Sequence, residues 1–128
     1  SLGYGSDVEV FKNAFLHIEG NGATNINATI ICGEHIHLCD RVMLGRDITI
    51  RDNNGNHYIA MRRYKDTRPV FIGQHAWLCE GAIIMPGVKI GDGAIIGAKS
   101  FVTQNVSAYS MVSGNPAQVI EEDVYWKY

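Results

Sequence analysis

The sequence is poor in the features that mark several large classes of protein. Its 128 residues include only three cysteines and three prolines, and its formal net charge is −2. Three cysteines without a CxxC pair cannot all form disulfides, which predicts a reducing, cytoplasmic environment. No hydrophobic run approaches the length of a membrane span, and no secretory signal pattern is present. So small a net charge provides no basic field for nucleic acid.

Glycine, in contrast, is frequent, with 14 residues, and aliphatic residues recur every six positions. In the second half of the chain the first aliphatic column contains Ile72, Leu78, Ile84, Ile90, Ile96 and Val102. A small or apolar column precedes it by two residues: Val70, Ala76, Ala82, Val88, Ala94 and Ser100. In the first half the same two columns contain Ile26, Cys32, Leu38, Leu44 and Ile50, preceded by Thr24, Ile30, Ile36, Val42 and Ile48.

A period of six fits neither the helix period of about 3.6 nor a series of hairpins. It fits a short strand, in which residues two apart share a face, followed by a corner that glycine can turn. Three such sides close a triangular coil, and stacked coils pair their strands in parallel. The sequence therefore predicts one all-β solenoid domain over residues 1–128.

Three segments depart from the repeat. Residues 1–23 lack a clean hexad, although Val8, Val10, Leu16 and Ile18 suit an irregular first coil. Residues 51–69 form an excursion, because the 22 residues from Ile50 to Ile72 are not a multiple of six. Residues 119–128 are expected to form a tail, with EEDVYWKY as a short helix that covers the last coil.

Two long segments carry a resemblance to a known family. RPVFIGQHAWLCEGAIIMPGVKIG (68–91) and IGDGAIIGAKSFVTQNVSAYSMVSGNPAQVI (90–120) resemble the closing coils of hexapeptide-repeat acyltransferases. The resemblance implies a left-handed parallel β-helix, a homotrimer with active sites between neighbours, and acetyl-CoA as donor. Within that family the chain looks closest to O-acetyltransferases of sugars and polysaccharides.

The resemblance assigns the acceptor side of the site to the excursion. His57 is similar in position to the family's catalytic histidine, whose pKa suits a general base near neutral pH; a solvated loop histidine is the alternative. Asp52 either orients that imidazole or caps a turn. Asn56, Tyr58 and Arg62 are candidate contacts to the acceptor. The excursion also holds a basic cluster, which either attracts an anionic acceptor or is simply solvated: Arg62, Arg63, Lys65 and Arg68.

The resemblance also implies which residues of the later coils bind the acetyl-CoA donor. The WLCE segment places the oxyanion-stabilising backbone amide at Glu80 and the cleft-lining tryptophan at Trp77. Pantetheine is expected to bond to the backbone at Ala98 and Thr103, and Lys99 is a candidate partner for the CoA phosphates. Where the family often has basic residues, this chain has glutamine, at Gln104 and Gln118.

Three rival functions share this fold. Carbonic anhydrases of the gamma class need two zinc-binding histidines five residues apart, but Glu80 stands five residues after His75. No metal is therefore expected, and His17, His35 and His37 are predicted to be outward-facing polar residues. An inactive binding scaffold and an N-acetyltransferase acting on an amino sugar stay open as alternatives.

Overall fold

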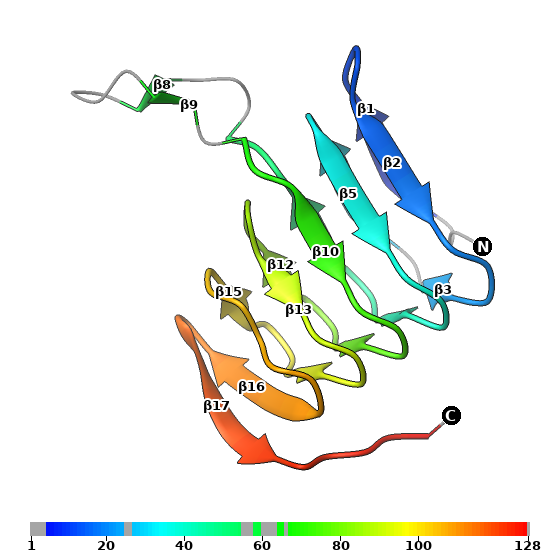
Figure 1. Ribbon diagram of the computed structural model, residues 1–128, viewed down its shortest axis with the longest axis vertical. Coiled ribbons are helices and arrows are strands. Elements are labelled where there is room, and N and C mark those ends of the chain that lie inside the picture. The colour runs from blue at the N-terminus through cyan, green and yellow to red at the C-terminus, as the bar shows by residue number, and fades with distance from the viewer. Residues whose placement is uncertain (1–4, 25–26, 55–57, 60–63, 66, 128) are drawn as a thin grey trace.

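The computed structural model describes residues 5–24, 27–54, 58–59, 64–65 and 67–127. Within these ranges every regular element is a strand, and no helix is long and apolar enough to cross a membrane. Strands from successive turns of the chain stack into three parallel sheets, so that the molecule is a β-solenoid of about four turns (Figure 1). The predicted fold class is confirmed.

Each sheet collects one side of every coil. The first sheet contains, in spatial order, β1 (Asp7–Val10), β4 (Thr29–Cys32), β7 (Thr49–Arg51), β12 (Ile83–Ile84) and β15 (Phe101–Val102). The second contains β2 (Phe15–Ile18), β5 (His35–Leu38), β10 (Val70–Ile72) and β13 (Lys89–Ile90). The third contains β3 (Ala23–Thr24), β6 (Met43–Leu44), β11 (Trp77–Leu78), β14 (Ile95–Ile96), β16 (Ser110–Gly114) and β17 (Ala117–Glu122).

The hexad columns form the core. Every member of the two columns that begin at Ile72 and Val70 is buried, with at most 1% of its surface exposed. When equivalent positions stack, a continuous row of aliphatic side chains is removed from water at each side of the triangle. This burial stabilises the fold by about 25 cal/mol per Å² of apolar surface. The period of six therefore corresponds to one side of the triangular coil, and each side places an aliphatic residue in the interior.

The segment before residue 24 completes a coil despite its irregular sequence. β1 and β2 pair in parallel with β4 and β5. Val8 and Leu16 pack against the core, as predicted for a first coil, whereas Val10 and Ile18 are 47% and 43% exposed. This coil has a neighbour on one side only within the described residues, so its inward-facing positions are covered less completely.

The excursion leaves the solenoid between the first and second sheets. It carries the antiparallel strands β8 (Tyr58–Ile59) and β9 (Tyr64–Lys65), which project from the stack of coils in Figure 1. Its two ends are joined at the base, where the N–H of Arg68 donates to the carbonyl oxygen of Asp52 at 2.8 Å. A projecting segment with a closed base leaves the coils above and below in register.

The predicted C-terminal helix is wrong. β17 runs antiparallel to β16 through Glu122, after a reversal in which Gly114 adopts a φ of 105° that favours glycine. The chain beyond is extended and returns along the solenoid, where the Trp126 indole N–H donates to the carbonyl oxygen of His75 at 2.7 Å. Pairing with a strand edge satisfies the backbone of this segment without a helix.

Candidate active site

The predicted acceptor-side residues fall mainly in the part of the excursion that the structure leaves undescribed. His57, Asn56 and Arg62 lie outside the described residues, so their roles stay predictions. Tyr58 lies at the start of β8, in the projecting hairpin. The described part of this region is its base, formed by Asp52 and Arg68.

Asp52 caps a corner of the solenoid. Its side chain is fully buried, and its Oδ1 accepts the backbone N–H of Gly33 at 2.6 Å. Its Oδ2 accepts the N–H groups of Glu34 and His35 at 2.8 and 2.7 Å, and the Asn53 side chain donates to Oδ1 at 3.0 Å. These contacts match the turn-capping alternative, because a carboxylate is a strong acceptor for converging amides. Whether Asp52 also contacts the predicted base is untested.

The predicted donor residues line one edge of the solenoid. Residues 45–48, 79–82 and 97–100 link the third sheet to the first in successive coils, and we call this line the Glu80 edge. Successive coils bond directly there: the N–H of Lys99 donates to the carbonyl of Glu80, and that of Gly81 to Arg46, both at 2.8 Å. Glu80, Ala98 and Lys99 are thereby brought close together, and all three are exposed.

Free backbone amides lie at the predicted positions. Among the described residues, no acceptor faces the N–H groups of Glu80, Ala98 or Thr103. Thr103 stands apart from the other two, across β15 at the next edge. An exposed N–H without a protein acceptor is available to a ligand oxygen, and this is the property that an oxyanion site requires.

Gly45 leaves room for the Glu80 amide. A Cβ at position 45 would lie 2.8 Å from the Glu80 nitrogen and 3.1 Å from both the Cys79 carbonyl carbon and the Leu78 oxygen. All three atoms belong to the backbone and cannot swing aside, so glycine is required at 45 for this approach of the two coils.

Gly45→Ala is therefore expected to displace the Glu80 amide and to lower kcat for acyl transfer by about tenfold to a hundredfold, the cost of a misplacement near 1 Å. Steady-state kinetics would measure this. Gly20→Ala is the matched control, because the nearest atom to its Cβ is Asp40 Oδ1 at 3.8 Å, an ordinary contact. An unchanged kcat in a folded Gly45→Ala protein would contradict the predicted role of the Glu80 amide in stabilising the oxyanion.

Trp77 lies in β11 between Met43 and Ile95 of the neighbouring coils and is 38% exposed. Its ring is 5.6 Å from that of Trp126, which stacks on His75 at 3.9 Å with parallel planes. An exposed indole with one side supported by a second indole provides a fixed apolar wall next to the Glu80 edge.

The cysteines are poorly suited to covalent catalysis. Burial raises the pKa of Cys32 and of Cys79, and the Asp52 carboxylate adds to the effect at Cys32. Burial and the neighbouring Glu19 carboxylate raise the pKa of Cys39 to about 11. The thiolate is the nucleophilic form, so these thiols are largely unreactive near neutral pH. The environment of the three cysteines therefore does not favour a covalent cysteine intermediate.

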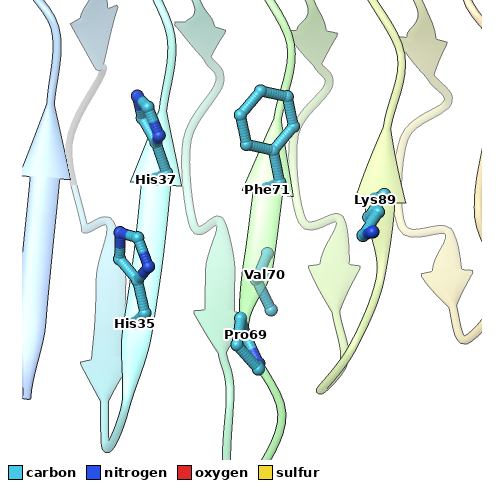
Figure 2. Close-up of a pocket in the computed structure, with 6 residues that line it drawn as sticks. All are labelled: His35, His37, Pro69, Val70, Phe71 and Lys89. Carbon is cyan, nitrogen blue, oxygen red and sulfur yellow. The ribbon is translucent and has the colours of Figure 1, made fainter.

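A groove of about 430 Å³ runs along the outer face of the second sheet (Figure 2). It is lined by His35, His37, Pro69, Val70, Phe71 and Lys89. Pro69 joins the end of the excursion to β10, so the groove begins where the excursion rejoins the solenoid. Its lining of rings and aliphatic stems suits the apolar face of a cyclic ligand.

Comparison with known proteins agrees with this geometry. The sequence model of the bacterial transferase hexapeptide, described as six repeats, matches residues 69–104. The same period continues through the earlier coils of the solenoid. Residues 69–104 of the chain therefore match the hexapeptide-repeat family in sequence.

The named proteins that this chain resembles in sequence are acetyltransferases. It is 28% identical to the galactoside O-acetyltransferase of Escherichia coli over 121 residues, which cover 93% of the chain and 56% of that enzyme. It is 43% identical to a chloramphenicol acetyltransferase of Agrobacterium fabrum over 63 residues, 49% of the chain and 30% of that protein. The chain thus spans about a third to just over half of the curated relatives it matches.

A solved structure extends the likeness to the whole solenoid. A hexapeptide-repeat-containing acetyltransferase from Vibrio cholerae O1 biovar eltor, in complex with acetyl coenzyme A, superposes with a TM-score of 0.78. Sequence identity is 25%, and the match covers 94% of this chain and 69% of the other. The predicted resemblance to hexapeptide-repeat acetyltransferases is confirmed.

Sequence reasoning missed two residues at the candidate site. Arg46 becomes a neighbour of Gly81 only because the excursion shifts the first half of the chain relative to the second. Trp126 reaches Trp77 because the tail runs back along the solenoid. The aromatic residues in VYWKY were the one available signal that the tail packs against a surface.

The two glutamines at the positions where the family is often basic lie together. Gln104 and Gln118 both line a hollow of about 90 Å³ between the last coil and β17. They offer hydrogen bonds but no charge there. Lys99 is exposed on the Glu80 edge with a φ of 57°, and its role toward the CoA phosphates stays a prediction.

Proposed function

We propose that this protein is an acetyl-CoA-dependent acetyltransferase that modifies a hydroxyl of a sugar or a polysaccharide precursor. The observation that carries the proposal is the Glu80 edge, where a free backbone amide lies in the same coil as exposed Trp77. The relationship to a galactoside O-acetyltransferase over 93% of the chain supports both the donor and the class of acceptor.

In the proposed reaction His57 accepts the proton of the acceptor hydroxyl as its oxygen attacks the thioester carbonyl. The Glu80 N–H donates to the oxyanion of the tetrahedral intermediate. Collapse breaks the carbon–sulfur bond, and the proton held by His57 passes to the departing CoA thiolate. The amides of Ala98 and Thr103 hold the pantetheine arm, with Trp77 as its apolar wall.

The positions of the two halves of this site support an assembly of several copies. The excursion leaves between the first and second sheets, whereas the Glu80 edge lies between the third and the first. The segment that contains the predicted base and the edge that contains the predicted oxyanion donor therefore begin at opposite edges of the first sheet. We propose that they meet across neighbouring copies of a homotrimer, in the arrangement that the family resemblance implies. A cytoplasmic location stays a prediction.

The proposal is tested by measuring free CoA released from acetyl-CoA in the presence of galactosides, oligosaccharides, amino sugars and chloramphenicol. We expect acetyl-CoA to raise the melting temperature, as ligand linkage requires, and CoA release to depend on a hydroxyl-bearing sugar. Release with amino sugars alone would make the protein an N-acetyltransferase. If acetyl-CoA does not bind and no CoA is released, the alternative of an inactive binding scaffold is the one that remains. The absence of positive charge at Gln104 and Gln118 favours that alternative.

A further inference from the structure

The outer face of the second sheet carries a group of side chains that the proposed reaction does not use. β2 and β5 pair in parallel, with His17 directly opposite His37. Side chains two residues apart on a strand share a face, and Glu19, just beyond the end of β2, therefore falls beside the same two histidines. One turn of the solenoid separates the residues in sequence.

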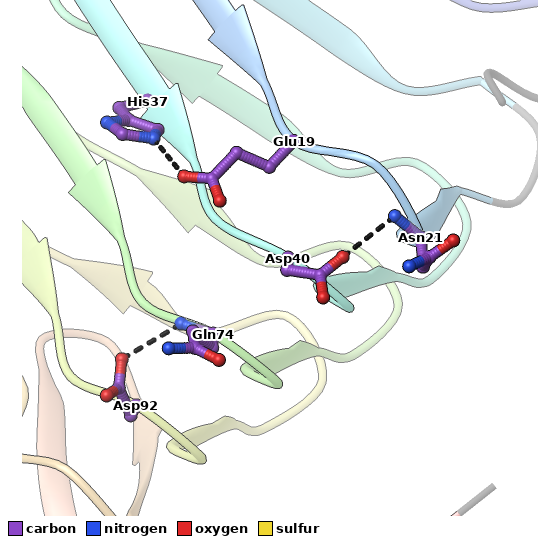
Figure 3. Close-up of polar contacts among 6 residues, drawn as sticks. All are labelled: Glu19, Asn21, His37, Asp40, Gln74 and Asp92. Atoms are coloured by element: carbon purple, nitrogen blue, oxygen red, sulfur yellow. Dashed lines mark hydrogen bonds and ion pairs between the residues drawn. The ribbon is translucent and has the colours of Figure 1, made fainter.

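The three side chains converge on one point. His37 Nε2 lies 2.5 Å from Glu19 Oε2, and Figure 3 draws this contact as a dashed line. The rings of His17 and His37 are stacked, with centroids 4.4 Å apart and planes inclined by 18°. One ligand atom from each of His17, Glu19 and His37 lies within 4.8 Å of the other two.

We propose that His17, Glu19 and His37 bind one divalent transition-metal cation of the zinc class. Two imidazoles and a carboxylate are a ligand set that zinc accepts, with bonds of about 2.0–2.2 Å. Ligand atoms of a tetrahedral site are then about 3.4 Å apart. Rotation about the χ angles of these partly exposed side chains has to widen the 2.5 Å contact between His37 and Glu19 and shorten any longer separation to this spacing. Solvent then occupies the fourth position.

The surroundings restrict where the two imidazoles can go. Phe15 contacts the ring of His17 at 6.0 Å between centroids, and Phe71 contacts that of His37 at 5.1 Å. Within the described part of the chain, the ring of His17 makes ring contacts but no hydrogen bond. A histidine stacked on another histidine beside a carboxylate, with a ring nitrogen left to solvent, is ready to ligate.

The site differs from the carbonic anhydrase pattern that the sequence excluded. That pattern needs histidines five residues apart, whereas His17 and His37 are equivalent positions of successive coils. The site is also separate from the Glu80 edge, because the second sheet does not adjoin that edge. Its expected effect is structural: an ion shared by β2 and β5 ties the outermost described coil to the next one.

The test uses purified protein stripped with EDTA and then dialysed, with Zn²⁺ and Co²⁺ as probes. We expect one Zn²⁺ per chain by equilibrium dialysis, a d–d absorption band of four-coordinate Co²⁺, and a higher melting temperature with Zn²⁺. His17→Gln and Glu19→Gln should each weaken Zn²⁺ binding by about tenfold or more, since each removes one of three protein ligands. His17 is exposed, so its variant is expected to fold normally.

His35→Gln is the matched control. His35 lies on the same face of β5 as His37, with ring centroids 6.1 Å apart, but outside the group of three. It should retain wild-type Zn²⁺ affinity. The proposal is overturned if the wild type binds no Zn²⁺, if the His17 and Glu19 variants bind as tightly as the wild type, or if His35→Gln loses binding to the same extent.

Discussion

If His57 is the general base proposed above, replacing it with alanine is expected to lower kcat for acetyl transfer by about a hundredfold to ten-thousandfold, the usual contribution of such a group. The acceptor hydroxyl then has no group to take its proton as it attacks the thioester. Acetyl-CoA affinity should be unchanged, because the proposed donor contacts lie on the Glu80 edge. The measurements are CoA release under saturating substrates and acetyl-CoA binding by calorimetry.

His17→Gln serves as the control for a general effect of losing a histidine, because His17 lines neither the groove nor the Glu80 edge, and its kcat should stay near that of the wild type. A second check uses pH. The wild-type kcat should fall as the pH drops below the pKa of the base, because the protonated imidazole cannot accept a proton, and the residual activity of His57→Ala should lose that dependence. A His57→Ala protein with wild-type turnover would mean that the base lies elsewhere.

The repeat made the fold predictable, because a solenoid core is a local pattern stacked on itself. Ile72, Ile84 and Ile96 could be assigned to the interior from their spacing alone, and all three are fully buried. For the candidate site residues, only the position on the fold was predictable, and only where they follow the same coils, as at Trp77 and Glu80. Here the sequence motif and the position on the solenoid coincide.

Contacts between coils were harder to predict. The group of His17, Glu19 and His37 depends on how the irregular first coil aligns with the second, and no hexad there fixes the alignment. A helix is expected in the tail because a solenoid needs a cap over its last coil. The chain instead continues as β17 through Glu122, because the edge of β16 offers hydrogen-bond partners, a tertiary effect that overrides local preference.

Asp52 illustrates the same limit at the base of the excursion. Its position before the predicted base indicated either an orienting carboxylate or a turn cap, and spacing could not distinguish them. The structure brings it to the corner between β4 and β5, with both oxygens bonded to backbone N–H groups of the preceding coil. Its own carbonyl oxygen accepts the N–H of Arg68, which closes the excursion.

Asp52→Asn is therefore expected to lower the free energy of unfolding by about 2–4 kcal/mol, because an amide group replaces one oxygen and faces buried donors. Urea unfolding followed by circular dichroism would measure the change. Asp40→Asn is the matched control: Asp40 is partly exposed and accepts one backbone N–H, from Asn21 at 2.9 Å (Figure 3). Its loss should cost no more than about 1 kcal/mol.

Equal stabilities of Asp52→Asn and the wild type would contradict the capping role. Kinetics at a temperature where the variant is fully folded then separates the two roles of Asp52. A cap alone leaves acetyl-CoA affinity and the pH dependence of kcat unchanged. A carboxylate that also orients the His57 imidazole stabilises its protonated form, so its removal would shift the acid limb of the kcat profile to lower pH. The direction of that shift assigns the role independently of how much stability is lost.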